Sequence, residues 1–231
     1  MFTVRCSEDP ALREMLSRHP FVELSPDHAQ RFEWAQESWR RHLSSGDERE
    51  GLYGLVELMD NNPLVCADCF SVPSPASTLA AIALGPLARA SLISDEVMMA
   101  SNLEEPADFP RLLEEIGVSH PVIWSQLGEP AQIALLSALV PVPEMDDDSA
   151  LDSLFEEAYG RSFYVRQTTE MNPEMVQGKP FAIYQLRITP GDGQSLLNVS
   201  VMADRDGKLG AAQMVHAFNV MCGFEESVGI E

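Results

Sequence analysis

Positive charge is scarce in this sequence of 231 residues. It has only two lysines, Lys179 and Lys208, and a formal net charge of −21. Lys and Arg do not cluster anywhere beyond the pair Arg40 and Arg41. A nucleic-acid backbone or an anionic membrane surface would be repelled by such a chain unless a local basic patch intervened. We therefore expect neither as a partner. A solvated acidic surface is the simple interpretation, and a specific basic protein partner is the alternative.

Long apolar runs are missing as well. No stretch approaches the roughly 20 uninterrupted apolar residues of a membrane span. The first residues carry charges where a signal peptide needs an apolar segment. Hydrophobic residues nevertheless make up 45% of the chain, which is ordinary for a globular domain. These features predict a folded, soluble, cytoplasmic protein with one sizeable core.

The four cysteines form no complete metal or redox motif. Cys66 and Cys69 make a CxxC pair, but a structural zinc site needs four ligands, and no second CxxC or His pair has suitable spacing. A thioredoxin-like pair would open a helix, whereas Pro73 and Pro75 follow too closely for a helix to begin at Cys69. We expect reduced thiols and no bound metal. The sequence also lacks GxGxxG and GxxxxGK[ST] loops, so its motifs predict no nucleotide cofactor.

Apolar periodicity and capping residues divide the chain into helices and strands. Helices are expected over residues 9–19, 25–43, 78–93, 109–115, 130–139, 148–160 and 211–222. The helix over 78–93, with Ser77 or Thr78 as its cap, is apolar nearly all round and should be buried. Short strands are expected at 20–25 and 64–66. Residues 180–189 and 196–204 alternate apolar and polar side chains on either side of a Pro-Gly-Asp-Gly turn, which predicts a β-hairpin.

Several short motifs, in this order, resemble the N-acetyl-γ-glutamyl-phosphate reductase family. The tail LGAAQMVHAFNVMCGFEESVGIE resembles the closing helix of that family, and FVELSPDHAQRF, GLYGLVEL and MVQGKPFAIYQL resemble its upstream motifs. The matches span residues 21–231. The resemblance implies an α+β fold with a mixed, mainly antiparallel sheet packed with helices, as in the C-terminal domain of glyceraldehyde-3-phosphate-dehydrogenase-like enzymes. Residues 1–50 would be a remnant N-terminal segment and residues 51–231 the semialdehyde-dehydrogenase-like substrate and dimerisation domain.

The resemblance also implies that the chemistry of the family has been lost. Its members are NADP-dependent oxidoreductases in which a cysteine attacks an acyl phosphate and hydride reduces the thioester. A dinucleotide-binding domain would lie before residue 21, and the 20 residues there are fewer than the 30 or so that a βαβ unit needs. We therefore expect no cofactor.

The catalytic side chains of the family are missing at the matching positions. Its nucleophilic cysteine matches Pro75 in one register. A second register brings Cys69 near that position, but too far ahead of the helix for the helix dipole to lower its thiol pKa. Its acid/base histidine matches Ser119, with His120 one residue along. Only Cys69 and His120 thus remain as candidate catalytic residues, and no cofactor-binding or metal-binding residues are expected.

Substrate binding is affected too. Ala138 replaces a histidine of the family, and Glu144 stands where an arginine should hold the substrate, so a carboxylate would repel an anionic substrate there. These losses together predict a catalytically inactive homologue, a pseudoenzyme related to arginine biosynthesis. We expect it to act as a homodimer, or in a hetero-oligomer with a related active enzyme, through the sheet that pairs subunits in the family.

Two alternatives remain open. The first is a re-purposed enzyme that acts on an acyl or semialdehyde substrate, with Cys69 as nucleophile and His120 or His28 as base. The second is a ligand sensor that uses the old substrate cleft, where Glu144 would favour a cationic ligand.

Overall fold

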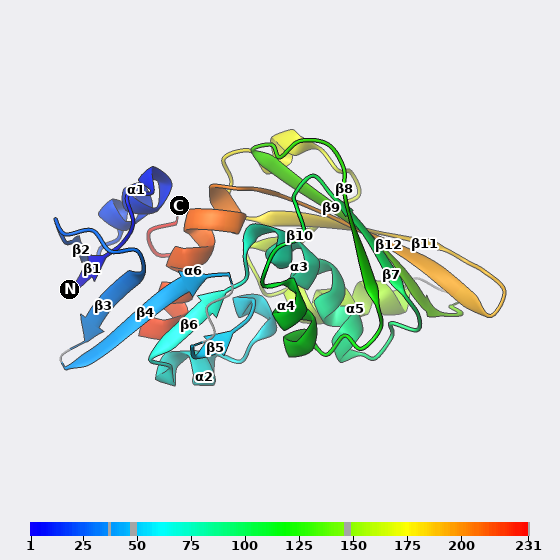
Figure 1. The fold of residues 1–231 in the computed structure, drawn as a ribbon, viewed down its shortest axis with the longest axis horizontal. Coiled ribbons are helices and arrows are strands. Elements are labelled where there is room, and N and C mark those ends of the chain that lie inside the picture. Colours follow the sequence, from blue (N-terminus) through cyan, green and yellow to red (C-terminus); the bar gives the residue numbers. More distant parts are fainter. Residues whose placement is uncertain (37, 47–49, 146–148, 231) are drawn as a thin grey trace.

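Two mixed β-sheets with helices packed against them form an α+β fold in the computed structural model (Figure 1). The structure describes residues 1–36, 38–46, 50–145 and 149–230. Within these ranges each sheet has six strands, and the chain forms six α-helices. The expected class, α+β with mixed sheets packed by helices, is confirmed.

Sheet A is formed by the N-terminal part of the chain. In the order β2-β1-β3-β4-β6-β5, its strands are Val22–Leu24, Phe2–Arg5, Phe32–Gln36, Trp39–Ser45, Cys69–Val72 and Leu52–Tyr53. β3 pairs antiparallel with β1 and β4, and the other pairs are parallel. One face packs against α1 (Pro10–Arg18), α2 (Asn61–Cys66) and α6 (Ala212–Cys222). Sheet A therefore continues past residue 50, the expected end of the N-terminal segment, and takes its largest helix from the C-terminal end.

Sheet B is formed by the rest of the chain. In the order β10-β11-β12-β9-β7-β8, its strands are Val165–Gln167, Ala182–Thr189, Gln194–Asp204, Ile133–Pro143, Val97–Ser101 and Val122–Gln126. The four central strands pair antiparallel, and the two edge strands pair parallel. One face packs against α3 (Pro75–Arg89), α4 (Phe109–Ile116) and α5 (Ser149–Tyr159), which enclose the larger hydrophobic core.

Helix α3 lies at the centre of that core, as its apolar sequence predicts. All of its residues from Ala76 to Leu87 are buried. The helix begins at Pro75, earlier than expected, because proline suits the first helical position, whose N–H has no partner within the helix. Ser77 and Thr78 are therefore inside the helix and do not cap it. The Ser77 hydroxyl donates to Asp108 instead.

Five other elements are confirmed by the structure. They are the helices α1, α4, α5 and α6 and the hairpin of β11 and β12. A sixth, the short strand expected at 20–25, is β2. Helix α6 ends at Gly223, whose positive φ of 71° gives the left-handed C-cap that glycine favours. In the described ranges no helix combines the length and the apolar character that a membrane crossing requires.

The expected helix over residues 25–43 is wrong, because this segment forms the antiparallel pair β3 and β4. Phe32 and Trp34 are two residues apart, so in a strand both side chains point to the same face. Both are buried, and their rings contact the ring of Phe218 in α6. Aromatic packing across the sheet decided this segment, against the helix-start signal of its first residues.

The predictions for two shorter segments are also wrong. Residues 64–66 end helix α2 and form no strand, since a three-residue apolar run has no periodicity that separates the two structures. The expected helix over 130–139 is instead strand β9, in which alternate residues from Ala134 to Val142 are buried. Ala and Leu favour helices locally, but pairing with β12 and β7 on both sides outweighs that preference.

Asp108, at the start of α4, connects the two halves of the molecule. Its buried carboxylate accepts hydrogen bonds from the Tyr53 hydroxyl (2.8 Å), the Ser74 backbone N–H (2.8 Å) and the hydroxyls of Ser74 (2.6 Å) and Ser77 (2.8 Å). Tyr53 belongs to sheet A, whereas the two serines begin α3. Burial and the bond to Asp108 raise the pKa of Tyr53 well above its ordinary value, so the hydroxyl stays a donor.

We expect Asp108→Ala to lower the free energy of unfolding by about 3–5 kcal/mol, since it leaves several buried donors without an acceptor. Asp108→Asn keeps one acceptor oxygen and should lose less. Urea unfolding followed by circular dichroism measures both. Asp192→Ala, in the exposed hairpin turn, is the control and should stay within about 0.5 kcal/mol of wild type. Equal losses at positions 108 and 192 would contradict this role.

Candidate functional site

The two candidate catalytic residues, Cys69 and His120, lie on different sheets. Cys69 opens β6 in sheet A, and His120 lies in the bend before β8, the edge strand of sheet B. The described residues that line the pocket beside Cys69 are Gly51, Leu52, Pro63, Ala67 and Asp68. His120 is not among them, so the structure does not assemble a Cys69–His120 pair.

The histidine nearest to Cys69 in the sheet is His42. Strands β4 and β6 are parallel, and His42 and Cys69 are direct partners in their register. Their side chains therefore leave the same face of sheet A. His42 belongs to residues 25–43, which the sequence analysis expects to be a helix. A helix there would not pair with β6, so that expectation could not reveal His42 as the neighbour of Cys69. Arg41, His42 and Leu43 alternate between buried and half-buried positions in the strand, but the buried Arg41 is charged, so the sequence shows no apolar alternation that could have revealed it.

The remaining positions singled out by the resemblance are dispersed. Pro75 is the first residue of α3, Ala138 is buried in β9, and Glu144 is exposed beyond the end of β9. His28 lies by Glu8 (3.3 Å) and Arg13 (3.3 Å) on the far side of sheet A. The described residues also contain no group of three or more His, Cys, Asp or Glu placed to hold a metal ion.

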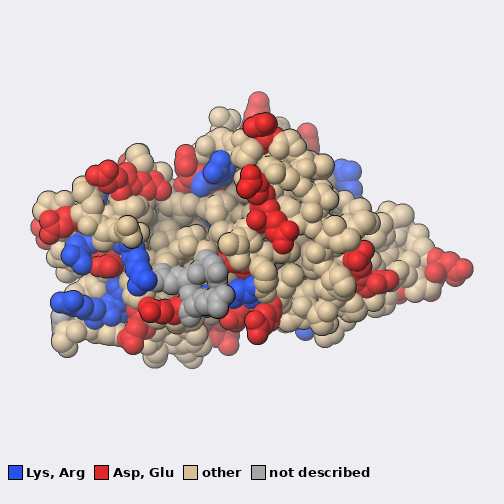
Figure 2. Space-filling model, viewed as in Figure 1, with Lys and Arg blue, Asp and Glu red and all other residues tan. Residues whose placement is uncertain are grey.

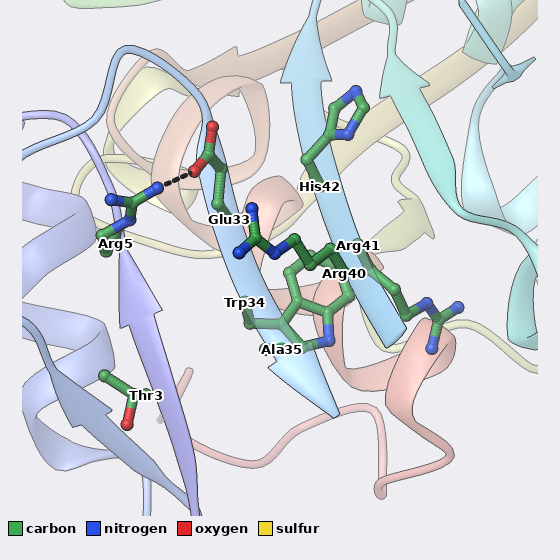
Figure 3. A pocket seen from close by; sticks show the side chains of 8 residues that line it. All are labelled: Thr3, Arg5, Glu33, Trp34, Ala35, Arg40, Arg41 and His42. Atoms are coloured by element: carbon green, nitrogen blue, oxygen red, sulfur yellow. Dashed lines mark hydrogen bonds and ion pairs between the residues drawn. The ribbon is translucent and has the colours of Figure 1, made fainter. Parts of the chain in front are cut away.

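The outer face of sheet A, which faces away from its helices, is open and polar. Figure 3 shows the shallow pocket of about 510 Å³ on this face. Arg5 and Glu33, on β1 and β3, form an ion pair of 2.6 Å, and Arg40 and His42 extend from β4 beside them. Figure 2 shows several Lys and Arg residues over sheet A, with Asp and Glu residues among them and over the rest of this view.

Arg40 and Arg41 do not form a joint basic patch, because they point to opposite faces of β4. Arg40 is exposed and Arg41 is buried. The Arg41 guanidinium donates to the backbone carbonyls of Leu64 (3.0 Å) and Met221 (2.7 Å), among others, and lies over the Trp39 ring at 4.2 Å. Arg41 thus supports the ends of α2 and α6 and is not available to a partner.

A buried ionic cluster lies where the two sheets meet. Glu57, in the 3₁₀ turn Val56–Leu58, pairs with Lys208 at 2.5 Å, and their side chains are 2% and 1% exposed. His216 of α6 lies 3.6 Å from Glu57 through Nδ1 and 3.0 Å from Glu226 through Nε2. The ring of Tyr164 covers the cluster, with its centroid 4.5 Å from the His216 ring. The sequence analysis did not identify this cluster, because its members are far apart along the chain.

Both glutamates of this ionic cluster are held in the charged form. Burial alone would raise the pKa of Glu57, but the nearby charges of Lys208 and His216 outweigh burial and lower it. The hydrogen bond from His216 lowers the pKa of Glu226, against a smaller effect of burial. The cluster therefore retains two carboxylates at neutral pH.

The outer face of sheet B, which faces away from its helices, is open and apolar. One end is covered by the loop of Val176, which packs on Ile183 and Met202. Beyond that loop, Ile123 pairs with Met98, and Met98 pairs with Leu139, so an apolar row crosses three strands. Ile123 is 48% and Met98 50% exposed.

This open face of sheet B exposes no carboxylate in the described strands. Its outward residues are Met98, Ala100, Ile123, Ser125, Ile133, Leu135, Ser137, Leu139, Pro141, Pro143, Arg166, Ile183, Gln185, Arg187, Thr189, Gln194, Leu196, Asn198, Ser200, Met202 and Asp204. Asp204, the one acidic residue among them, is 3% exposed and accepts a hydrogen bond from the Gly178 N–H in the loop that covers this end. The whole chain has 36 Asp and Glu residues, so a sheet face without an exposed one stands out from the rest of the surface. An exposed apolar patch of this kind is typical of association surfaces.

The bond between His216 and Glu226 predicts a pH-dependent contribution to stability. At pH 7 we expect Glu226→Gln to lower the free energy of unfolding by about 0.5–1 kcal/mol, a modest loss because the Glu226 side chain is 44% exposed and screened by solvent. The folded pKa of Glu226 is below the unfolded value of about 4.3, so the contribution is present above that pH and is lost as the pH falls through the folded pKa.

Urea unfolding of both proteins at about pH 7 and about pH 3.5 measures this difference, which should shrink in acid. Glu225→Gln, at the exposed neighbouring position, is the matched control and should behave as wild type at both pH values. A Glu226→Gln difference that persists or grows in acid would contradict the ionised pair.

The comparisons with known proteins give no family for this chain. No protein-family model matches the sequence, and no curated protein matches it significantly. The functional conclusions therefore depend on the residues and their geometry.

Proposed function

We propose that the protein is a catalytically inactive relative of the N-acetyl-γ-glutamyl-phosphate reductases that self-associates through the outer face of sheet B. Two of the motifs that carry the resemblance meet in space, which supports the relationship. GLYGLVEL contributes Glu57 to the buried ionic cluster, and the C-terminal tail contributes His216 and Glu226. Motifs that contact one another in the core are more informative than the same motifs scattered over a surface.

The observation that carries the proposal is the open face of sheet B, whose described strands expose no carboxylate. Each copy has a formal charge of −21, so two copies repel one another wherever their acidic surfaces meet. A sheet face with no exposed acidic side chain is where that repulsion is weakest. The centre of the face is also flat, because Ala100, Ser137 and Ser200 are small and lie in one row across β7, β9 and β12. Flat sheet faces pack against each other at about 10 Å.

A second copy is the occupant that these features favour. A two-fold axis would bring the Ile123–Met98–Leu139 row of one copy onto the same row of the other, and apolar area would be buried on both sides. A related enzyme with the same kind of sheet could take the place of the second copy.

The residues at the start of α3 support the proposal that the protein has lost the reductase chemistry of the family. Pro75 has no nucleophilic group, and the hydroxyls of Ser74 and Ser77 are engaged by the buried carboxylate of Asp108. Cys69 lies upstream in β6 and not at the helix N-terminus, where a helix dipole would lower its thiol pKa.

We infer a cytoplasmic protein, since no disulfide joins the four cysteines.

Self-association predicts a particle of twice the 25.5 kDa chain mass at micromolar concentration. Met98→Glu places one carboxylate from each copy in the interface, and like charges there cost several kcal/mol, so the dissociation constant should rise about 100-fold or more. Added NaCl should strengthen the wild-type dimer by screening the net charge. Size-exclusion chromatography with light scattering measures the mass, and circular dichroism verifies the fold.

The matched control for Met98→Glu is Phe163→Glu, because Phe163 is also exposed but lies between α5 and β10, away from this face. It should leave the dimer intact. A wild-type protein that is strictly monomeric at micromolar concentration would refute self-association.

The second candidate function is cysteine chemistry with Cys69 as nucleophile and His42, instead of His120, as base. The parallel register of β4 and β6 favours it, since it places both residues next to each other on the open face of sheet A. A thiolate and a nearby base are the minimum that such chemistry requires.

Thiol labelling at about pH 6 distinguishes the two functions, because only an activated cysteine is a thiolate at that pH. A non-catalytic protein should show Cys69 alkylated no faster than the exposed Cys66. Mass spectrometry of the labelled peptides gives both rates. Faster labelling of Cys69, abolished by His42→Asn, would favour the enzyme.

A further inference from the structure

A polar pocket of about 1090 Å³ lies above the buried ionic cluster, on neither of the open sheet faces. Its floor is formed by Glu57 and His216, with Glu226 at the side. Its rim comes from the start of α2, the end of α3 and the end of α5, where two carboxylates and two arginines line it: Asp60, Arg89, Glu157 and Arg161. The volume is at the upper end of the range for small-molecule sites.

Two buried atoms on the floor have no hydrogen-bond partner among the described residues. They are Oε2 of Glu57 and Nδ1 of His216, and both side chains are at least 98% buried. Leaving a buried polar atom without a partner is unfavourable, so such atoms usually have a partner. Both residues line the pocket, which is the direction from which a partner can reach them.

The chemistry of the Glu57 oxygen specifies a donor. The Glu57 oxygen can only accept while the carboxylate is charged. Nε2 of His216 is engaged by Glu226 at 3.0 Å, and Nδ1 is the ring nitrogen that faces Glu57. Asp60, Glu157 and Glu226 also line the pocket, which together with Glu57 gives it four carboxylates. An ammonium group supplies both the hydrogens and the opposite charge.

The arginines at the rim of the pocket favour an anionic group, whereas the floor favours a cationic one. Arg89 and Arg161 are exposed, and neither forms an ion pair with any described carboxylate. Although Asp60 and Glu157 also line the pocket, these two arginines pair with no carboxylate of the described residues, so they provide a site for an external anion. A guanidinium binds a carboxylate through two parallel hydrogen bonds.

We propose that this pocket binds a small zwitterion of the α-amino acid class, with its ammonium group at Glu57 and its carboxylate at Arg89 and Arg161. The volume leaves room for a side chain. The site is independent of the association face of sheet B, so this proposal and the proposed self-association can fail separately.

The first test is thermal unfolding of the full chain with each of the standard amino acids in turn at about 5 mM, against sodium acetate, methylammonium chloride and sodium phosphate at equal ionic strength. At least one amino acid should raise the melting temperature by about 2 °C or more beyond the three salts. If no amino acid exceeds the salts, or if one salt alone reproduces the whole shift, the zwitterion site is refuted.

The second test uses calorimetric titration with the amino acid that gives the largest shift. Arg161→Gln should weaken binding about fivefold or more, because it removes one charged contact to the carboxylate. Arg205→Gln, an exposed arginine outside the pocket, is the matched control and should change affinity less than about twofold. Equal effects of both variants would overturn the proposed orientation.

Glu57→Gln tests the floor directly, but it removes the counter-ion of the buried Lys208 and can destabilise the fold. Glu226→Gln is therefore measured as a second variant. Because the Glu226 side chain is partly exposed, we expect the protein to stay folded without its charge. Reduced affinity in the folded Glu226→Gln protein supports the ammonium position, and unchanged affinity contradicts it.

Discussion

The buried ion pair between Glu57 and Lys208 fixes how the two sheets are placed against each other. The partners are 151 residues apart in the chain: Glu57 follows strand β5 of sheet A, and Lys208 follows the long strand β12 of sheet B. Removing both charges from water is unfavourable by several kcal/mol for each ion, and the contact at 2.5 Å offsets that loss only when the geometry is kept. A shifted packing of the sheets would leave one buried charge alone. The main effect of the Glu57–Lys208 pair is therefore to select one relative arrangement of the two sheets, and its contribution to the free energy of unfolding is secondary.

His216 extends this constraint to α6. Its ring lies between Glu57 and Glu226 and stacks near Tyr164, so the C-terminal helix is held against both sheets. The same arrangement leaves Glu57 Oε2 and His216 Nδ1 without a hydrogen-bond partner among the described residues, and both residues line the adjoining pocket. One cluster thus accounts for the relative placement of the two sheets and for the chemistry of the proposed ligand site.

Helices cover one face of each sheet, and the distribution of charge distinguishes the two faces that they leave open. The open face of sheet A is polar and includes the Arg5–Glu33 ion pair, which water solvates well. The open face of sheet B carries Met98, Ile123 and Leu139, and its described strands expose no carboxylate. On a molecule with a net charge of −21, association is most favourable where acidic groups are missing. This difference is why self-association is assigned to sheet B and not to sheet A.

Local patterns in the sequence determined the acidic character of the chain, the buried helix α3, the amphipathic helices α1, α4 and α5, and the hairpin of β11 and β12. Net charge is independent of conformation, and helical or strand periodicity acts over only a few residues. Tertiary structure alone decided that residues 25–43 and 130–139 form strands, that His42 and not His120 neighbours Cys69, and that Glu57 meets Lys208. Each of these depends on pairing between segments that are distant in the chain, and the burial gained by that pairing outweighs the local preference of the residues involved.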